Sequence, residues 1–203
     1  MVKRVGDLSA NGRVAGTVKM ERLYCDASFW RGYGGMAVVG PSWAASGGGP
    51  WRRLWDVRIV SELQWDGYTV FWSACRCKSS NDAEKRAMGL AFLLAYDIVR
   101  ARAGTKVEVL SDSLIVLNWI TSDRVREDPI LEPMRSLWQQ RRVILSKVKG
   151  HTGNRGNELA DEWAKYARVQ LEVMSEPAGS NSSAWDLLGS VETMRASKTG
   201  YQD

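Results

Sequence analysis

A long helical pattern between two strand patterns is the feature that most constrains the fold of this chain. Residues 68–77, YTVFWSACRC, are rich in β-branched and aromatic side chains, and residues 106–111, KVEVLS, alternate apolar and polar positions. Between them, residues 79–104 carry apolar side chains at helical spacing, with Asn81 as the expected N-cap and Gly104 as the expected end. A strand, a helix and a strand in succession predict a sheet with a helix packed on one face.

The rest of the chain extends this pattern in both directions. Further strand patterns occupy residues 22–29, 32–40, 57–64 and 143–150. A hairpin turn is predicted at Asp66-Gly67, between residues 57–64 and residues 68–77. Further helix patterns occupy residues 113–123, 129–142 and 157–174, the first capped by Ser111, Asp112 or Ser113. An antiparallel start followed by alternating strands and helices predicts one mixed α/β sheet with helices on its faces.

The domain organisation follows from composition. The 203 residues are enough for one domain with extensions. Residues 1–20 are expected to be a flexible N-terminal extension, 21–170 the folded domain, and 171–203 a mobile, Ser- and Gly-containing extension. Residues 41–55, with two prolines, a triple glycine and three tryptophans, break the strand pattern and indicate an insertion.

Composition also excludes several classes of protein. No apolar run approaches the roughly 20 residues that span a bilayer, and the N-terminus lacks the apolar region of a secretory signal, so no membrane contact is expected. The odd number of cysteines, three, indicates reduced thiols in an intracellular, cytoplasmic protein. A net charge of +5 favours a polyanionic partner.

Four carboxylates stand at positions where a function is conceivable. Asp26 lies in the middle of a strand pattern, Glu84 in the first turn of the long helix, and Asp112 at the carboxyl end of residues 106–111. Asp161 borders the apolar stripe of the last helix. Each has an ordinary explanation taken alone: a solvent-facing strand position, a capping box, an N-cap, and an ion pair with Lys165 four residues later.

Taken together, the four carboxylates suggest a metal site. Three or four of them in one place repel each other unless a cation offsets their charge. Oxygen ligands without thiolates select Mg²⁺ or Mn²⁺ over Zn²⁺. A carboxylate cluster in a basic chain favours phosphodiester chemistry. Spacing alone leaves open whether the four side chains meet.

Four motifs in order resemble those of the type 1 ribonucleases H. They are YCDAS around Asp26, SSNDAE ending at Glu84, LSDS around Asp112, and KGHTGNRGNELAD, in which His151, the only histidine, precedes Asp161 by ten residues. The resemblance covers about residues 21 to 168. It implies an α/β fold of the ribonuclease H type, a five-stranded mixed sheet with helices on both faces.

The resemblance also implies a chemistry. It is endonucleolytic hydrolysis of the RNA strand of RNA-DNA hybrids by two metal ions, two Mg²⁺ with Mn²⁺ as the alternative, leaving 5′-phosphate and 3′-hydroxyl ends. The metal ligands would be Asp26, Glu84, Asp112 and Asp161, with Asp26 bridging both ions. His151 would assist proton transfer or product release from a loop made mobile by glycines.

Substrate contacts are implied for Ser28, Ser79 and Asn81, with shape and 2′-hydroxyl contacts providing the selection. The chain departs from the family at Leu114, where many members carry a glutamine that reaches into the groove. The insertion at 41–55 combines tryptophans with arginines, which suits a nucleic-acid contact, a protein contact, or a hydrophobic flap folded onto the sheet. A monomer is expected.

Two other functions stay open. One is a nucleic-acid-binding module that keeps the fold without catalysis, against which all four carboxylates are present. The other is a different nuclease on the same scaffold, such as a resolvase or exonuclease. The spacing of His151 and Asp161 argues against that second alternative.

Overall fold

The computed structural model describes residues 19–41, 59–102, 104–122, 135, 138–150 and 152–175. Most of the expected N-terminal extension, nearly all of the insertion and the chain beyond Ser175 lie outside these residues. So do much of the helix expected at 129–142 and the whole of His151.

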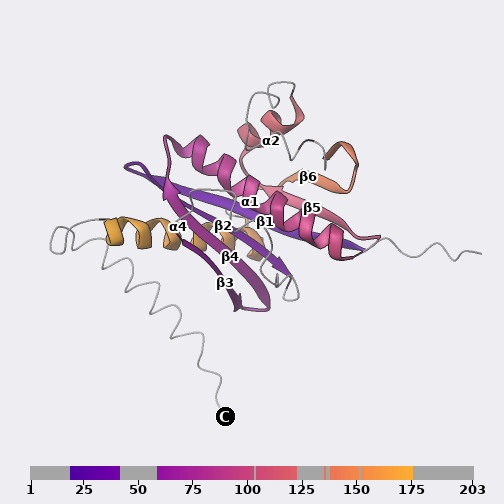
Figure 1. Ribbon diagram of the computed structural model, residues 1–203, viewed down its shortest axis with the longest axis horizontal. Coiled ribbons are helices and arrows are strands. Elements are labelled where there is room, and N and C mark those ends of the chain that lie inside the picture. Colours follow the sequence, from indigo (N-terminus) through magenta and orange to yellow (C-terminus); the bar gives the residue numbers. More distant parts are fainter. Residues whose placement is uncertain are drawn as a thin grey trace, which may run out of the picture.

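Six strands form one mixed sheet in the order β3-β4-β2-β1-β5-β6 (Figure 1). The pairs β1–β2, β2–β4 and β3–β4 are antiparallel, whereas β1–β5 and β5–β6 are parallel. The strands are β1 (Met20–Trp30), β2 (Tyr33–Pro41), β3 (Ile59–Trp65), β4 (Tyr68–Arg76), β5 (Lys106–Ser111) and β6 (Val143–Lys147). The α/β class and the mixed sheet are confirmed.

The sheet has one strand more than the five that the family resemblance implied. The additional strand is at the edge, where β3 pairs only with β4 among the described strands. Its turn into β4 contains Asp66 and Gly67 with φ of 50° and 77°. Two successive residues with positive φ match the twist of a two-residue hairpin, which is why the predicted Asp-Gly turn forms here.

Within the described residues, the bounds of three helices are defined: α1 (Ser80–Ala101), α2 (Leu114–Thr121) and α4 (Arg155–Ser175). The N-cap of α1 is Ser79, not the expected Asn81. The reason is geometric: the Ser79 hydroxyl accepts a hydrogen bond from the backbone N–H of Asp82 at 3.2 Å, whereas Asn81 already lies inside the first turn. Ser113 is the N-cap of α2, one of the three residues expected there.

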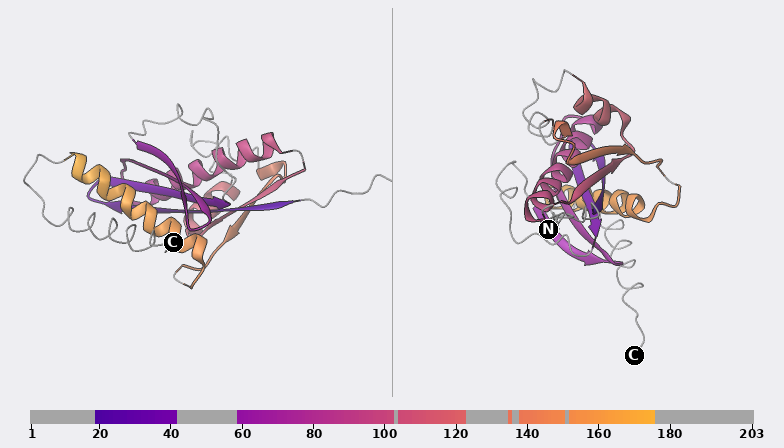
Figure 2. Two further views of the ribbon diagram at one scale, coloured as in Figure 1. Left: turned by 90° about the horizontal axis from the view of Figure 1, so that it is seen from below. Right: turned by 90° about the vertical axis from the view of Figure 1, so that its right-hand side faces the viewer.

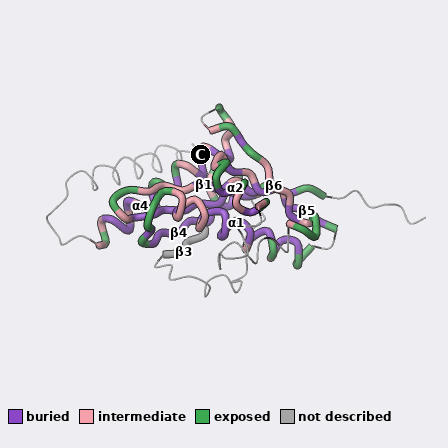
Figure 3. The backbone as a smooth tube through the Cα atoms, turned by 90° about the horizontal axis from the view of Figure 1, so that it is seen from above, coloured by how far each residue is buried: buried purple, intermediate pink, exposed green. Residues whose placement is uncertain are grey.

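The two long helices cover opposite faces of the sheet (Figure 2). The apolar stripe of α1 packs on one face against side chains such as Leu23 and Val109. On the other face, α4 packs against β1, β2 and β4 through Trp163, whose ring lies 6.5 Å from that of Trp72 and 5.1 Å from that of Tyr166. The central strands are therefore buried on both sides, whereas exposed residues concentrate at turns and on outer helix surfaces (Figure 3).

Two glycines allow α4 to lie unusually close to the sheet. A β-carbon on Gly35 of β2 would overlap the backbone of α4 at Ala164, and one on Gly156 of α4 would overlap the ring of Tyr24. Larger residues at either position would push the helix outward. This close contact brings the helix that carries Asp161 next to the middle of β1. No helix in the described ranges is long and apolar enough to cross a membrane.

Candidate metal centre

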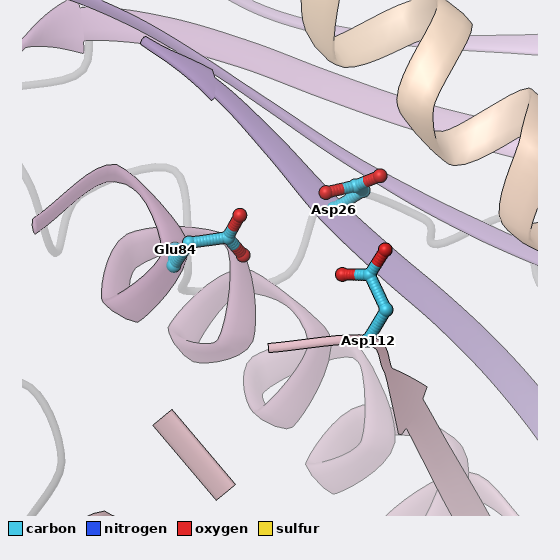
Figure 4. A group of neighbouring side chains, drawn as sticks. All are labelled: Asp26, Glu84 and Asp112. Carbon is cyan, nitrogen blue, oxygen red and sulfur yellow. The ribbon is translucent and has the colours of Figure 1, made fainter. Parts of the chain in front are cut away.

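Three carboxylates from distant parts of the sequence meet at one point. Asp26 projects from β1, Glu84 from the beginning of α1, and Asp112 from the residue that follows β5 (Figure 4). One oxygen from each of the three lies within 4.8 Å of the others. The structure thus brings together three of the four predicted metal ligands.

The position of this cluster follows from the sheet. The parallel strands β1 and β5 pair up to Tyr24 and Leu110. Beyond that pair β1 continues to Asp26. Strand β5 ends at Ser111, and the chain then leaves the sheet and turns into α2. Parallel strands commonly build ligand sites where they separate at their carboxyl ends. Asp26 and Asp112 therefore flank the opening between the strands.

Burial and mutual repulsion raise the pKa values of two of these carboxylates. Asp26 is only 7% exposed, and its burial together with the charge of Asp112 raises its pKa to about 7, although the N–H of Ala27 donates to its Oδ1 at 2.7 Å. Burial, followed by the charges of Asp26 and Asp112, raises the pKa of Glu84 to about 8. Groups of this kind gain a counter-charge when a cation binds between them.

The donor set fits a hard divalent cation. All three converging groups are carboxylates, and the residues near them that affect the Asp26 and Glu84 pKa values are mainly further acids. Thiolate is absent from this group of ligands, which disfavours Zn²⁺. The geometry could hold Mg²⁺ or Mn²⁺.

Asp161, the fourth predicted ligand, lies outside the group of three. Its Oδ2 accepts a hydrogen bond from Nζ of Lys165 at 2.6 Å. Its charge nevertheless contributes to the raised pKa values of both Asp26 and Glu84, which places it at the edge of the same site.

His151 is outside the described residues, but the chain on its N-terminal side is in contact with the site. The N–H of Val148 donates to the carbonyl of Ser111 at 3.1 Å. A β-carbon on Gly150 would lie 2.7 Å from Oδ2 of Asp112. The segment that leads to His151 therefore begins beside one of the three carboxylates.

The three predicted substrate-binding residues lie close in the chain to Asp26 and Glu84. Ser28 shares a strand face with Asp26, and its hydroxyl accepts from Nε of Arg168 at 3.1 Å. Ser79 caps α1. Asn81 is partly buried in the first turn of α1, three residues before Glu84. Both serines thus have intramolecular partners.

Two charged residues close in the chain to predicted ligands were not singled out as functional from the sequence. Asp82 accepts from the N–H of Lys78 at 2.9 Å and from Nε of Arg86 at 3.2 Å, which ties the end of β4 to the turn of α1 that carries Glu84. Its signal was its place in the first helical turn. Lys165 was visible only as an ion-pair partner of Asp161, and nothing in the spacing placed its ammonium group beside a carboxylate cluster.

Known proteins of one family are similar to parts of this chain. Residues 70–168 match the model of the RNase H family. Over 56 residues the chain is 49% identical to Ribonuclease H of Methylobacillus flagellatus, a match that covers 27% of this chain and 37% of that relative. The chain thus aligns with well under half the length of that protein. The crystal structure of RNase H1 from the halophilic archaeon Halobacterium salinarum is 20% identical with a TM-score of 0.44, covering 73% of this chain and 96% of that one.

The structure defines a carboxylate cluster on a mixed α/β sheet. Residues 70–168 of the chain are similar to the ribonuclease H family. The matched range contains Glu84, Asp112 and Asp161, and the structure adds Asp26 from outside it.

Proposed function

We propose that this protein is a ribonuclease H, an endonuclease that hydrolyses the RNA strand of RNA-DNA hybrids. The observation that carries the proposal is the meeting of Asp26, Glu84 and Asp112 within 4.8 Å in a chain whose residues 70–168 match this family. The net charge of +5 supports a polyanionic substrate. The catalytic domain would span about residues 21–170 and act as a monomer, with residues 41–55 available for a further contact.

Asp26, Glu84, Asp112 and Asp161 would hold two divalent cations, Mg²⁺ or Mn²⁺, with Asp26 between them. Such a pair, when bound, activates water and stabilises the charge that develops on phosphate oxygens, in a reaction that leaves 5′-phosphate and 3′-hydroxyl ends. The raised pKa values of Asp26 and Glu84 support the proposal, because burial and neighbouring negative charges outweigh the counter-charges among the described residues.

The remaining residues would orient the substrate and move a proton. His151, which follows Gly150 in the chain, would transfer a proton or assist product release. Ser79 and Asn81, at the beginning of α1, would contact the hybrid next to Glu84. Ser28, two residues after Asp26, would face the same groove. A protein that reads groove shape and 2′-hydroxyl groups in this way distinguishes a hybrid from duplex DNA.

Cleavage of four end-labelled substrates tests the proposal. The substrates are RNA-DNA hybrid, duplex DNA, duplex RNA and single-stranded RNA, each with Mg²⁺, with Mn²⁺ or with EDTA. We expect metal-dependent cutting confined to the RNA of the hybrid, with 5′-phosphate products. Asp112→Asn should abolish it.

A matched control is Asp97→Asn, the same isosteric change in α1. Asp97 lies thirteen residues after Glu84 on that helix, or roughly 20 Å along its axis. This variant should cut at the wild-type rate. If the folded wild-type protein binds hybrid but cuts no substrate with either metal, the protein is a binding module. Cutting of duplex DNA instead would identify another nuclease activity.

A further inference from the structure

The ion pair between Lys165 and Asp161 stands at the edge of the carboxylate cluster. The Lys165 ammonium group lies 2.6 Å from Oδ2 of Asp161. Asp161 precedes Lys165 by one helical turn on α4. The Lys165 side chain is 56% exposed, whereas that of Asp161 is 22% exposed. The lysine can therefore withdraw into solvent at little desolvation cost, on a flexible stem that holds a compact charge.

An ordinary helix-surface pair would explain the spacing of these two residues. The charges of the pair also reach the neighbouring strand β1. The Asp161 charge raises the pKa of Asp26, and the Lys165 charge, the smaller of the two effects, lowers it. The pair therefore lies on the side of the cluster where α4 is in close contact with β1.

The pair also bears on the place of Asp161 in the site. Asp26, Glu84 and Asp112 already lie within 4.8 Å of each other, and Asp161 does not belong to that group. Its oxygen Oδ2 is engaged by Lys165. A cation that is to be held by Asp161 through that oxygen must first displace the ammonium group.

We propose that Lys165 is a positioning residue that neutralises Asp161 in the metal-free protein and is exchanged for a divalent cation when the site fills. Metal binding and breaking of the Lys165–Asp161 pair are then one coupled event. The inference rests on the proposed function for the identity of the ligand, a divalent cation, and not for catalysis. Lys165 sets the metal concentration at which Asp161 joins the site, and the displaced ammonium becomes free to meet a substrate phosphate.

Calorimetric titration of the full chain with MgCl₂, without nucleic acid, tests this coupling. Lys165→Met keeps most of the side-chain volume and removes the charge. We expect it to bind Mg²⁺ roughly two- to fivefold more tightly, the range that corresponds to loss of one partly exposed ion pair. Lys165→Arg should bind as the wild type does. Arg155→Met, which removes a positive charge and the ion pair to Asp66 from the same helix, should also leave the Mg²⁺ affinity unchanged.

A double-mutant cycle separates exchange at Asp161 from a general change of charge. In an Asp161→Asn background, Lys165→Met should produce no further change in Mg²⁺ affinity, because the pair is already absent. Thermal unfolding in EDTA establishes that each variant is folded, and Lys165→Gln replaces Lys165→Met if the latter is not. Unchanged Mg²⁺ affinity in the single variant, or an effect that persists in the Asp161→Asn background, would overturn the proposal.

The result of the Mg²⁺ titrations is independent of whether the protein cuts RNA. A protein that shows the expected Mg²⁺ titrations but cleaves no hybrid would retain the coupling and lose the proposed ribonuclease function. If the Lys165→Met variant cleaves hybrid with the same metal requirement as the wild type, the proposed ribonuclease function stands and the coupling is contradicted.

Discussion

Gly150 and Asp112 are so close that a side chain at residue 150 would have to displace the Asp112 carboxylate. A β-carbon at position 150 would lie 2.7 Å from Oδ2 of Asp112, a distance that β-carbons in proteins essentially never show. The glycine therefore leaves the Asp112 carboxylate free to hold its place in the cluster.

Gly150→Ala should impair the site without unfolding the protein. The added methyl group displaces either the Asp112 carboxylate or the loop, and misplacement by about 1 Å can cost on the order of a hundredfold in rate. We expect cleavage of hybrid to fall by about tenfold or more, with weaker Mg²⁺ binding by calorimetry. The control is Thr152→Ala, which should cut normally. It removes a hydroxyl in the same loop that donates a hydrogen bond to the carbonyl of Lys149. Wild-type cleavage by Gly150→Ala would show that the loop relaxes freely.

Glu84→Gln should lower the cleavage activity and raise the stability of the metal-free protein. The carboxylate is partly buried among like charges, so a neutral isostere removes repulsion in the metal-free protein. At pH 8 in EDTA we expect the free energy of unfolding to rise by about 1 kcal/mol or more, while cleavage falls by at least about a hundredfold. Urea denaturation and hybrid cleavage measure the two quantities. A variant that is both inactive and less stable would mean that Glu84 is held by favourable contacts instead.

The stability of the metal-free protein should fall as pH rises from about 5 to 8. Folding raises the pKa of Asp26 from 3.8 to about 7 and that of Glu84 from 4.5 to about 8. Between those values the folded protein binds protons that the unfolded chain has released, so unfolding becomes easier as these protons are lost, with a limiting slope of about 1.4 kcal/mol per pH unit for each group.

Melting temperatures in EDTA at successive pH values measure this slope. The double variant Asp26→Asn/Glu84→Gln should flatten it, and saturating Mg²⁺ should flatten it in the wild type, because a bound cation stabilises the ionised carboxylates. An identical pH profile for the wild type and the double variant would contradict the assignment.

Ser79 offers a way to separate helix capping from substrate binding. Ser79→Ala removes the bond to the N–H of Asp82 and should cost about 1 kcal/mol of stability. Ser79→Asp can restore the cap, and its negative charge also suits the helix N-terminus. If Ser79 touches a phosphate, Ser79→Asp will recover stability in urea denaturation but bind hybrid several-fold more weakly than Ser79→Ala. Equal hybrid affinities for the two variants would leave Ser79 with a capping role alone.

Much of the fold could be read from local patterns. The alternation in residues 106–111 and the apolar stripe of α1 became a buried strand and a buried helix face. The pattern at residues 57–64 also predicted a strand, and β3 forms there, although the family resemblance implied only five strands in all. Local chemistry decides such elements, because turn residues and periodicity act over a few positions.

The way in which the site is assembled could not be predicted from local sequence patterns. Asp26, Glu84 and Asp112 were predicted as partners, but their meeting depends on where β1 and β5 separate and how α1 crosses them. Gly35 carries no local signal that a helix backbone will lie against it. Asp161 lies outside the group of three and is bonded to Lys165, a pair that the sequence indicated only as an ordinary helix pair.

The aromatic contacts beneath α4 give the molecule a built-in optical reporter. The ring of Trp163 lies 5.8 Å from that of Trp65, and the Trp72 ring packs beside it on β4. Indoles at such separations couple their electronic transitions, so near-ultraviolet circular dichroism should carry a signature of α4 docked on the sheet. Because the same helix carries Asp161, this signal would follow the position of the fourth carboxylate without any attached label.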